Sequence, residues 1–258
     1  MLTLYFSGTG NSKYVAELFA ADMGGDCLSI EETTDFSGLI AAADTVAFVY
    51  PVYASRVPRI LREFVQSHKA DLLDKQLVIL ATQMGFSGDG ARCFTDMLER
   101  NTYRVLYAEH ITMPNNISNL FIFPRTGDKR AKRQLAAAQR KIRRICGNLR
   151  TGISVKRGFN PFSRLLGLVQ GAFEPRMEQL AKSSVEIGGE CTGCGLCVKR
   201  CPMHNLVMEN GKAKALSNCT ECYRCINLCP AKAIRIYFKK KVDWQYRGPY
   251  RGKNNDSA

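Results

Sequence analysis

Eight of the eleven cysteines in this 258-residue chain lie in one stretch, where their spacing repeats. The first run is Cys191-x2-Cys194-x2-Cys197-x3-Cys201-Pro202. The same pattern recurs 28 residues later as Cys219-x2-Cys222-x2-Cys225-x3-Cys229-Pro230. Clustered thiols form disulfides in small secreted proteins, but disulfides do not require such regular spacing. The repeat therefore predicts metal ligation in a reducing compartment.

Two kinds of metal centre compete for these cysteines. A zinc site usually takes two Cys-x2-4-Cys pairs per ion and needs neither a third cysteine at this spacing nor a Cys-Pro step. An iron–sulfur cluster takes four thiolates, and three cysteines spaced x2, x2 can wrap around one face of it. The fourth cysteine of each run is too far along the chain to reach the same cluster. The pattern favours two iron–sulfur clusters over zinc.

This module, residues 186–238, resembles the bacterial two-[4Fe–4S] ferredoxins, in which the fourth cysteine of each run binds the other cluster. The resemblance implies that the first cluster is held by Cys191, Cys194, Cys197 and Cys229. It implies that the second is held by Cys219, Cys222, Cys225 and Cys201. Such crossing would staple together a module that has little core of its own. Gly193 and Gly195 permit a close backbone approach to the first cluster, whereas Glu221 and Tyr223 occupy those positions in the second run.

A second stretch with chemical potential, YFSGTGNSKY, spans residues 5–14. Small and hydroxyl residues between an apolar strand and a helix suit a phosphate, which backbone N–H groups at the helix start would bind. A nucleotide-hydrolysing loop needs Gly-x4-Gly-Lys-[Ser/Thr], but here Lys13 follows Ser12 and precedes Tyr14. A dinucleotide fingerprint needs a third glycine where Lys13 stands. Neither of these two sites is therefore expected.

The loop resembles the FMN phosphate loop of flavodoxins, which implies phosphate binding by Ser7, Gly8, Thr9, Gly10, Asn11 and Ser12. In such sheets the flavin lies beyond the carboxyl ends of the strands. Candidate ring contacts therefore follow the third and fourth strands, at Pro51, Val52 and Tyr53 and at Gly85, Phe86, Ser87, Gly88 and Gly90. Tyr53 is the candidate for stacking on the ring, with a surface aromatic as the alternative. Residues 113–118 are a further candidate edge of the site.

The elements that position this loop alternate between strand and helix. Apolar, β-prone runs predict strands at residues 2–6, 27–30, 45–50, 77–82 and 103–111. Helical spacing of apolar residues predicts helices at 11–23, 57–65, 90–100 and 129–149. This alternation predicts an α/β fold, a flavodoxin-like doubly wound five-stranded parallel sheet, followed by a small α+β two-cluster ferredoxin domain.

The composition suggests where one part of the chain ends and the next begins. We expect a flavodoxin-like FMN-binding domain at residues 1–150 and a basic amphipathic linker with one short helix at 151–185. A 2×[4Fe–4S] ferredoxin domain at 186–238 and a basic mobile tail at 239–258 are expected to follow.

The net charge of +14 is uneven along the chain. Residues 1–128 hold 10 Lys and Arg against 15 Asp and Glu, whereas residues 129–185 hold 14 against 2. No nucleic-acid recognition motif accompanies the basic block. A solvated helix face, a docking patch for an acidic redox protein or flavoenzyme, and peripheral contact with an anionic membrane remain open. No apolar stretch is long enough to span a membrane and no signal peptide is visible, so a cytoplasmic location is expected.

The chain as a whole resembles the EFR1-family ferredoxins of anaerobes, in which a flavodoxin-like domain precedes a two-cluster ferredoxin. The resemblance implies an electron-transfer protein that passes single electrons between two [4Fe–4S] clusters, FMN and a redox partner. A flavin-dependent reductase of a small molecule, acting at an open FMN face and fed by the clusters, is the alternative. The sequence shows no paired carboxylates, no nucleophile with a base and no nicotinamide fingerprint to support that enzyme.

Overall fold

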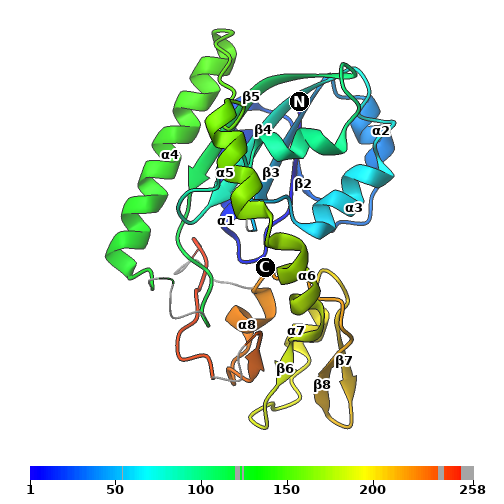
Figure 1. Ribbon diagram of the computed structural model, residues 1–258, viewed down its shortest axis with the longest axis vertical. Coiled ribbons are helices and arrows are strands. Elements are labelled where there is room, and N and C mark those ends of the chain that lie inside the picture. Colours follow the sequence, from blue (N-terminus) through cyan, green and yellow to red (C-terminus); the bar gives the residue numbers. More distant parts are fainter. Residues whose placement is uncertain (54, 120–122, 124, 238–240, 251–258) are drawn as a thin grey trace.

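The computed structural model describes residues 1–53, 55–119, 123, 125–237 and 241–250, and its larger part is built on one parallel sheet (Figure 1). The strands are β1 (Leu2–Tyr5), β2 (Asp26–Ser29), β3 (Thr45–Pro51), β4 (Lys75–Gln83) and β5 (Tyr103–Thr112). Their order is β2-β1-β3-β4-β5, and every neighbouring pair is parallel. This order is the doubly wound flavodoxin-like one, so the predicted fold class is confirmed.

Helices cover both faces of this sheet. One face carries α1 (Asn11–Met23) and α4 (Asp128–Arg150), whose apolar residues pack with β3 and β4. The other face carries α2 (Phe36–Ala41), α3 (Arg59–Ser67) and the 3₁₀ helix η1 (Arg92–Met97). The interiors of β3 and β4 are buried on both faces, which is why they read as continuous apolar runs. The sequence did not indicate α2, because six residues are too few to show a helical period.

The segment between α4 and the cysteines differs from the expected linker. It first lies beside β5, where the Ala108 N–H donates to the Val155 carbonyl oxygen at 2.7 Å. Two helices follow, α5 (Pro161–Gly171) and α6 (Glu174–Ser183), where one was predicted. Pro175 lies in the first turn of α6, where its missing N–H costs no hydrogen bond, so a second helix can begin there.

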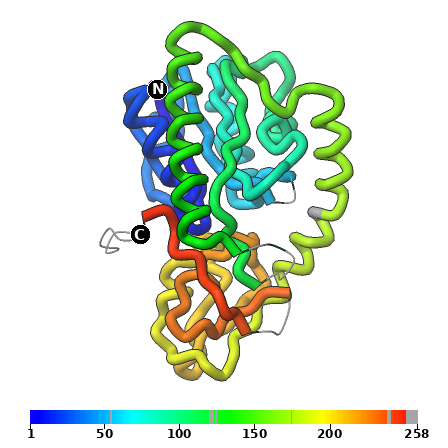
Figure 2. Tube along the Cα trace, turned by 90° about the vertical axis from the view of Figure 1, so that its left-hand side faces the viewer, coloured from blue at the N-terminus to red at the C-terminus, as the bar shows by residue number. Residues whose placement is uncertain are grey.

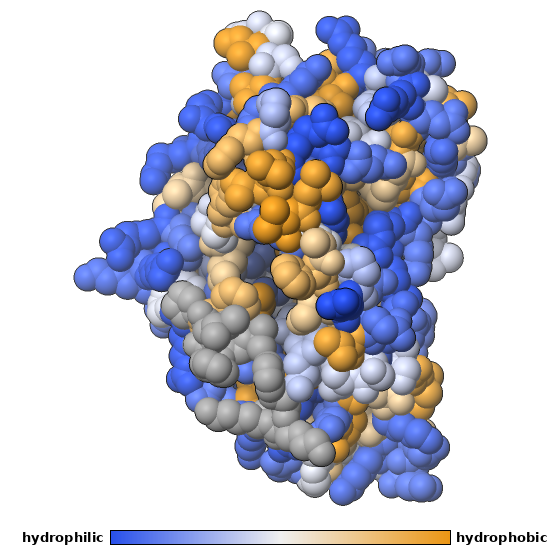
Figure 3. Space-filling model, viewed as in Figure 1, coloured by the Kyte–Doolittle hydropathy of each residue, from blue (hydrophilic) through white to orange (hydrophobic). Residues whose placement is uncertain are grey.

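Helix α5 turns its large apolar side chains away from the protein. Its buried residues are Ser163, Gly167 and Gly171. Both glycines pack closely against the protein: a Cβ atom on Gly167 would overlap the Asp89 side chain, and one on Gly171 would overlap the Arg56 side chain. The exposed residues on the opposite side of the helix are Phe162, Leu165, Leu168 and Val169. Figure 3 shows the resulting hydrophobic area over α5.

The cysteine module lies at the carboxyl edge of the parallel sheet (Figures 1 and 2). Its elements are β6 (Glu186–Ile187), α7 (Leu196–Lys199), β7 (Leu206–Glu209), β8 (Lys212–Ala215), α8 (Arg224–Leu228) and β9 (Ile234–Arg235). Strands β6 and β9 form one antiparallel pair, and β7 and β8 form another. A small core that includes Leu206, Ile226 and Ile234 joins them.

The described part of the tail, residues 241–250, packs against the rest of the protein (Figure 2). Val242 joins the core of the cysteine module, and Tyr246 is buried next to the start of α1. The expectation of a mobile tail therefore does not fit residues 241–250, while residues 239, 240 and 251–258 lie outside the described residues. Within the described part of the chain, no helix is long and apolar enough to cross a membrane.

Candidate functional site

The eight cysteines of the repeat line two small cavities. The first cavity is bordered by Cys191, Cys194, Cys197 and Cys229. The second cavity is bordered by Cys201, Cys219, Cys222 and Cys225. Each cavity thus combines three cysteines of one run with the fourth of the other. The structure brings the cysteines together in the two sets that the ferredoxin resemblance implies.

The donor set of each cavity suits an iron–sulfur cluster. Four thiols surround each cavity, and a cluster takes four thiolates. Backbone N–H groups also point at the cysteine sulfurs, since Asn205 N lies 3.2 Å from Cys201 Sγ and Ala233 N lies 3.3 Å from Cys229 Sγ. Within the described residues, no three His, Cys, Asp or Glu side chains are grouped closely enough to hold a single metal ion.

The candidate phosphate loop connects β1 to α1 at the same edge of the sheet. Gly10 precedes the helix with φ 92° and provides no side-chain cap, so N–H groups of the first turn are available to an anion. The buried Ser7 Oγ has no hydrogen-bond partner among the described residues. Ser12 Oγ lies 2.8 Å from Thr82 Oγ1, which ties the loop to the end of β4. These groups suit a bound phosphate.

A larger pocket of about 1,020 Å³, including its open mouth, extends from this loop and is called the edge pocket here. Its lining includes Ser7, Gly8, Thr9, Asn11, Ser12, Pro51, Val52 and Tyr53. The Tyr53 hydroxyl is buried without a partner among the described residues, and burial raises its pKa well above the usual value. Met113, Pro114, Asn116 and Ile117 form another edge of the pocket, from the loop that follows β5.

Most of the loop after β4 does not line the edge pocket, although ring contacts were expected from it. Thr82, Gln83 and Met84 line the edge pocket, but its described lining does not include Gly85, Phe86, Ser87, Gly88 or Gly90. A Cβ atom on Gly88 would come within 2.6 Å of Gly167 N, so this glycine serves the close approach of α5. Phe86 is 59% exposed. The sequence could not show this, because α5 follows more than seventy residues later.

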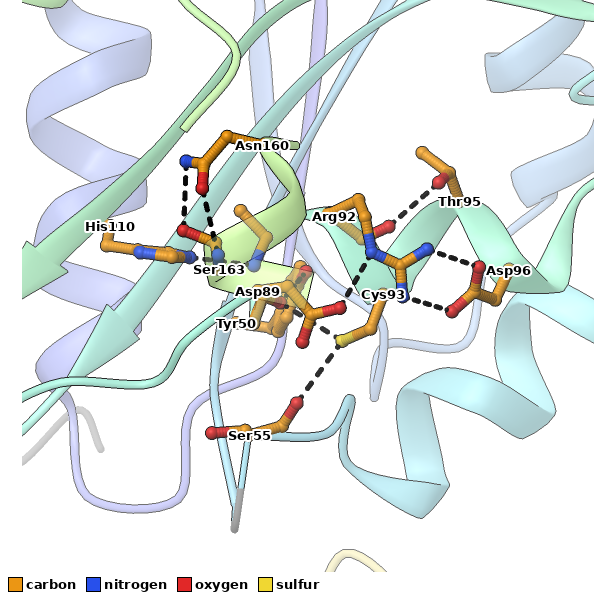
Figure 4. A network of polar contacts seen from close by, with 12 residues as sticks. Tyr50, Ser55, Asp89, Arg92, Cys93, Thr95, Asp96, His110, Asn160 and Ser163 are labelled. Atoms are coloured by element: carbon orange, nitrogen blue, oxygen red, sulfur yellow. Dashed lines mark hydrogen bonds and ion pairs between the residues drawn. The ribbon is translucent and has the colours of Figure 1, made fainter. Parts of the chain in front are cut away.

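Side-chain bonds hold the loop after β4 in this place (Figure 4). Arg92 Nε donates to Asp89 Oδ2 at 2.7 Å, and its other nitrogens bind Asp96. The Cys93 thiol donates to the carbonyl oxygens of Gly90 and Ser55, so the loops after β3 and β4 are joined. This network gives the 85–90 loop a role in supporting α5 and the loop after β3.

The sequence analysis missed five lining residues of the edge pocket. One is Phe123, between β5 and α4. The others come from later in the chain: Met177 of α6, Glu221 and Tyr223 of the second cysteine run, and Tyr237. No sequence signal points to these four, because they reach the pocket only when the cysteine module packs on the sheet edge. Thr82 was also missed, although its place at the carboxyl end of β4 is a usable signal.

The phosphate loop and the second cysteine run are in direct contact. A Cβ atom on Gly8 would overlap the carbonyl oxygen of Cys222, so only glycine permits this approach. Arg224 donates to the carbonyl oxygens of Ser7 and Gly8 at 2.8 and 3.1 Å, and it also pairs with Glu31. The loop and the cysteine run therefore form one continuous site.

Comparisons with known proteins agree with this geometry. Residues 2–116 match the family model of the flavodoxin domain, and residues 190–234 match that of the 4Fe-4S dicluster domain. The chain is a flavodoxin–ferredoxin fusion. As such, this fusion is an electron-transfer protein of the flavin and iron–sulfur type.

Solved structures similar to the fusion cover little more than half of its length. The WrbA-like flavodoxin from Agrobacterium tumefaciens is 17% identical, covers 58% of this chain and 97% of its own, and has a TM-score of 0.40. The Trp repressor binding protein from Bacillus subtilis is 17% identical, covers 54% and 96% of the two chains, and has a TM-score of 0.39. No curated protein matches the chain.

Proposed function

We propose that this fusion passes single electrons between two [4Fe–4S] clusters and one FMN, and on to a redox partner, as the EFR1-family ferredoxins it resembles are expected to do. The observation that supports this proposal is that the two sites have a lining residue in common. Tyr223 lines both the second cysteine cavity and the edge pocket. A cluster in that cavity and a flavin in that pocket would be neighbours.

The proposed flavin site uses residues of both cofactor-binding loops. Ser7 to Ser12 and the start of α1 hold the phosphate, while Pro51, Val52 and Tyr53 border the ring. Thr82 to Met84 replace the glycines of the 85–90 loop as the proposed contribution from β4. When bound, FMN accepts one or two electrons and each cluster passes one. The chain's part is to hold, orient and shield these groups.

The pocket favours an electron carrier over a reductase. A reductase needs an open flavin face that a small substrate can reach. Met177, Tyr223 and Tyr237 instead line the pocket from the side of α6 and the cysteine module. The proposed carrier would therefore show slow flavin reoxidation by a broad panel of small oxidants when no partner protein is added. Rapid reoxidation by one of them would favour the reductase.

A partner surface is proposed on α4. The exposed residues Lys129, Arg133, Arg140 and Arg143 recur at helical spacing on its outer face, opposite the buried Ile142 and Ile145. Other basic residues nearby have acidic partners within the protein, such as Arg150 with Asp22. We propose that the outer face of α4 docks an acidic redox protein.

The direct experiment is anaerobic purification and reconstitution, with iron, sulfide and flavin assayed on the same sample. We expect about eight irons and one FMN per chain. Zinc in place of iron, or fewer than five irons after full reconstitution, would overturn the two-cluster assignment.

The crossing of the ligands is tested by comparing cysteine variants. Cys201→Ala should cause the same loss of electron paramagnetic resonance signal as Cys219→Ala, because both residues border the second cavity. Cys229→Ala should instead match Cys191→Ala. Cys27→Ala, outside both cavities, serves as the control and should leave both signals intact. If Cys201→Ala matched Cys191→Ala, each run would hold its own cluster.

A further inference from the structure

The two cysteine runs provide an internal comparison of backbone geometry. In the first run Gly193 and Gly195 have φ values of 72° and 70°, in the left-handed region that glycine adopts readily. The equivalent residues of the second run are Glu221 and Tyr223, with φ values of 56° and 58°. Left-handed backbone is unfavourable for residues with a Cβ atom, and more so for a bulky one. The second run therefore keeps two strained residues where the first has glycines.

These two residues border the edge pocket, whereas the equivalent glycines of the first run are not among its described lining residues. Both line the edge pocket, and Tyr223 is buried between that pocket and the second cysteine cavity. A Cβ atom on Gly195, the equivalent of Tyr223, would meet nothing within 4 Å. Strained residues commonly occur where a side chain serves a ligand.

The backbone around Tyr223 is tied to both sites. The Glu221 N–H points at Cys219 Sγ at 3.4 Å, while the Asn227 N–H donates to the Tyr223 carbonyl oxygen at 3.1 Å. On the flavodoxin side, Arg224 holds the carbonyl oxygens of Ser7 and Gly8. These bonds fix the position of Tyr223 relative to the phosphate loop.

We propose that Glu221 and Tyr223 are flavin-site residues supplied by the cysteine module, so that the flavin site is shared between the two domains. The inference rests on the proposed FMN site. The Tyr223 ring gives the flavin an aromatic neighbour, and Glu221 extends the same wall. With this left-handed backbone, one short loop directs its cysteines towards a cluster. Its other side chains are directed towards the flavin.

The test replaces Tyr223 by residues that suit its backbone. Tyr223→Gly makes the second run like the first, and Tyr223→Asn keeps a side chain that tolerates left-handed φ. Both should retain about eight irons per chain, because neither alters a cysteine. Both should bind FMN about tenfold more weakly, while Tyr223→Phe should bind it nearly as the wild type does. Affinity is measured by quenching of flavin fluorescence on deflavinated protein with its clusters intact.

Ser217→Gly is the matched control, because Ser217 also has positive φ in the same module but does not line the pocket among its described residues. It should leave FMN affinity unchanged. Unchanged affinity in Tyr223→Gly, or loss of iron in both the Gly and Asn variants, would overturn the inference. Failure of the wild type to bind FMN would instead overturn the proposed function.

Discussion

Single residues near β5 show how burial sets protonation in this protein. Glu109 is 1% exposed, and its carboxylate lies 3.2 Å from Lys141 Nζ and 3.1 Å from Arg157 Nε. Burial opposes its ionisation, but the His110 N–H and these cations outweigh that and hold the pKa of Glu109 below its usual value. Next to it, burial lowers the pKa of His110 to about 4. His110 Nε2 accepts a hydrogen bond from the Ala91 N–H at 2.9 Å, which requires a neutral ring.

This environment predicts a pH-dependent stability. Because the pKa of His110 falls from 6.5 to about 4 on folding, the unfolded chain binds the extra proton between these values. The contribution of neutral, buried His110 to the free energy of unfolding is therefore complete above about pH 6.5 and is lost as the pH falls towards 4. From pH 7 to pH 5 the wild type should lose about 2 kcal/mol more unfolding free energy than His110→Gln.

The comparison is made by anaerobic urea unfolding followed by circular dichroism at both pH values. His110→Gln serves as the control, because the effects of acid on all other titratable groups occur in both proteins. Equal losses in the two proteins would mean that His110 is not buried in the neutral form.

At the residue scale, local spacing was sufficient to find the two cysteine runs and the candidate phosphate loop. Both lie within short stretches whose geometry the backbone fixes. Tyr223 and Glu221 could be recognised only as departures from glycine. They line the edge pocket only where Cys222 packs against Gly8, more than two hundred residues earlier.

Among the elements, α5 shows the limit of reasoning from periodicity. An amphipathic pattern predicts that the large apolar side packs inward. In α5 the small side packs inward instead, because Gly167 and Gly171 must approach Asp89 and Arg56 closely. By contrast, β3, β4, α1 and α4 appear close to the predicted bounds, since their long apolar patterns correspond to real burial.

The segment 241–250 acts as a strap between elements. The Tyr246 hydroxyl donates to Asn11 Oδ1 at 2.7 Å, and the Tyr246 N–H donates to Asn227 Oδ1 at 2.6 Å. A Cβ atom on Gly10 would lie 3.2 Å from Pro249 Cδ. The strap therefore joins α8 to the beginning of α1.

Removing one hydroxyl from the strap should have a measurable cost. Tyr246→Phe leaves the buried Asn11 Oδ1 without its donor and should lower the free energy of unfolding by about 1 kcal/mol. Tyr250→Phe is the matched control, because its hydroxyl bonds Glu17 on an exposed surface and should matter less. Both are compared by urea unfolding. A larger loss in Tyr250→Phe would contradict the role given to Tyr246.

At the scale of the whole molecule, a half-buried cation joins the two domains. Arg224 belongs to the cysteine module, but it binds the phosphate loop and Glu31 of the flavodoxin domain. The sequence could assign each domain separately, since each has its own motif. It could not show that they share a site, because no local pattern encodes their contact.

Arg224→Gln should therefore weaken flavin binding although the residue lies in the iron–sulfur module. Loss of charged hydrogen bonds to the phosphate loop should reduce FMN affinity about tenfold. Arg235→Gln is the matched control, because its side chain is also 16% exposed but pairs with Glu190 inside the module. Flavin titration of the deflavinated proteins gives both affinities. If the Arg224→Gln and Arg235→Gln variants bound FMN equally tightly, Arg224 would only support the fold.

The strap also has a consequence for biosynthesis. Asn11 and Tyr246 are 235 residues apart, so the ribosome makes the phosphate loop on the order of tens of seconds before the residue that covers it. During that interval the nascent flavodoxin domain has an uncovered loop, and the iron-binding cysteines have not all been translated. The proposed flavin site, which Tyr223 of the cysteine module also lines, is therefore complete only late in translation.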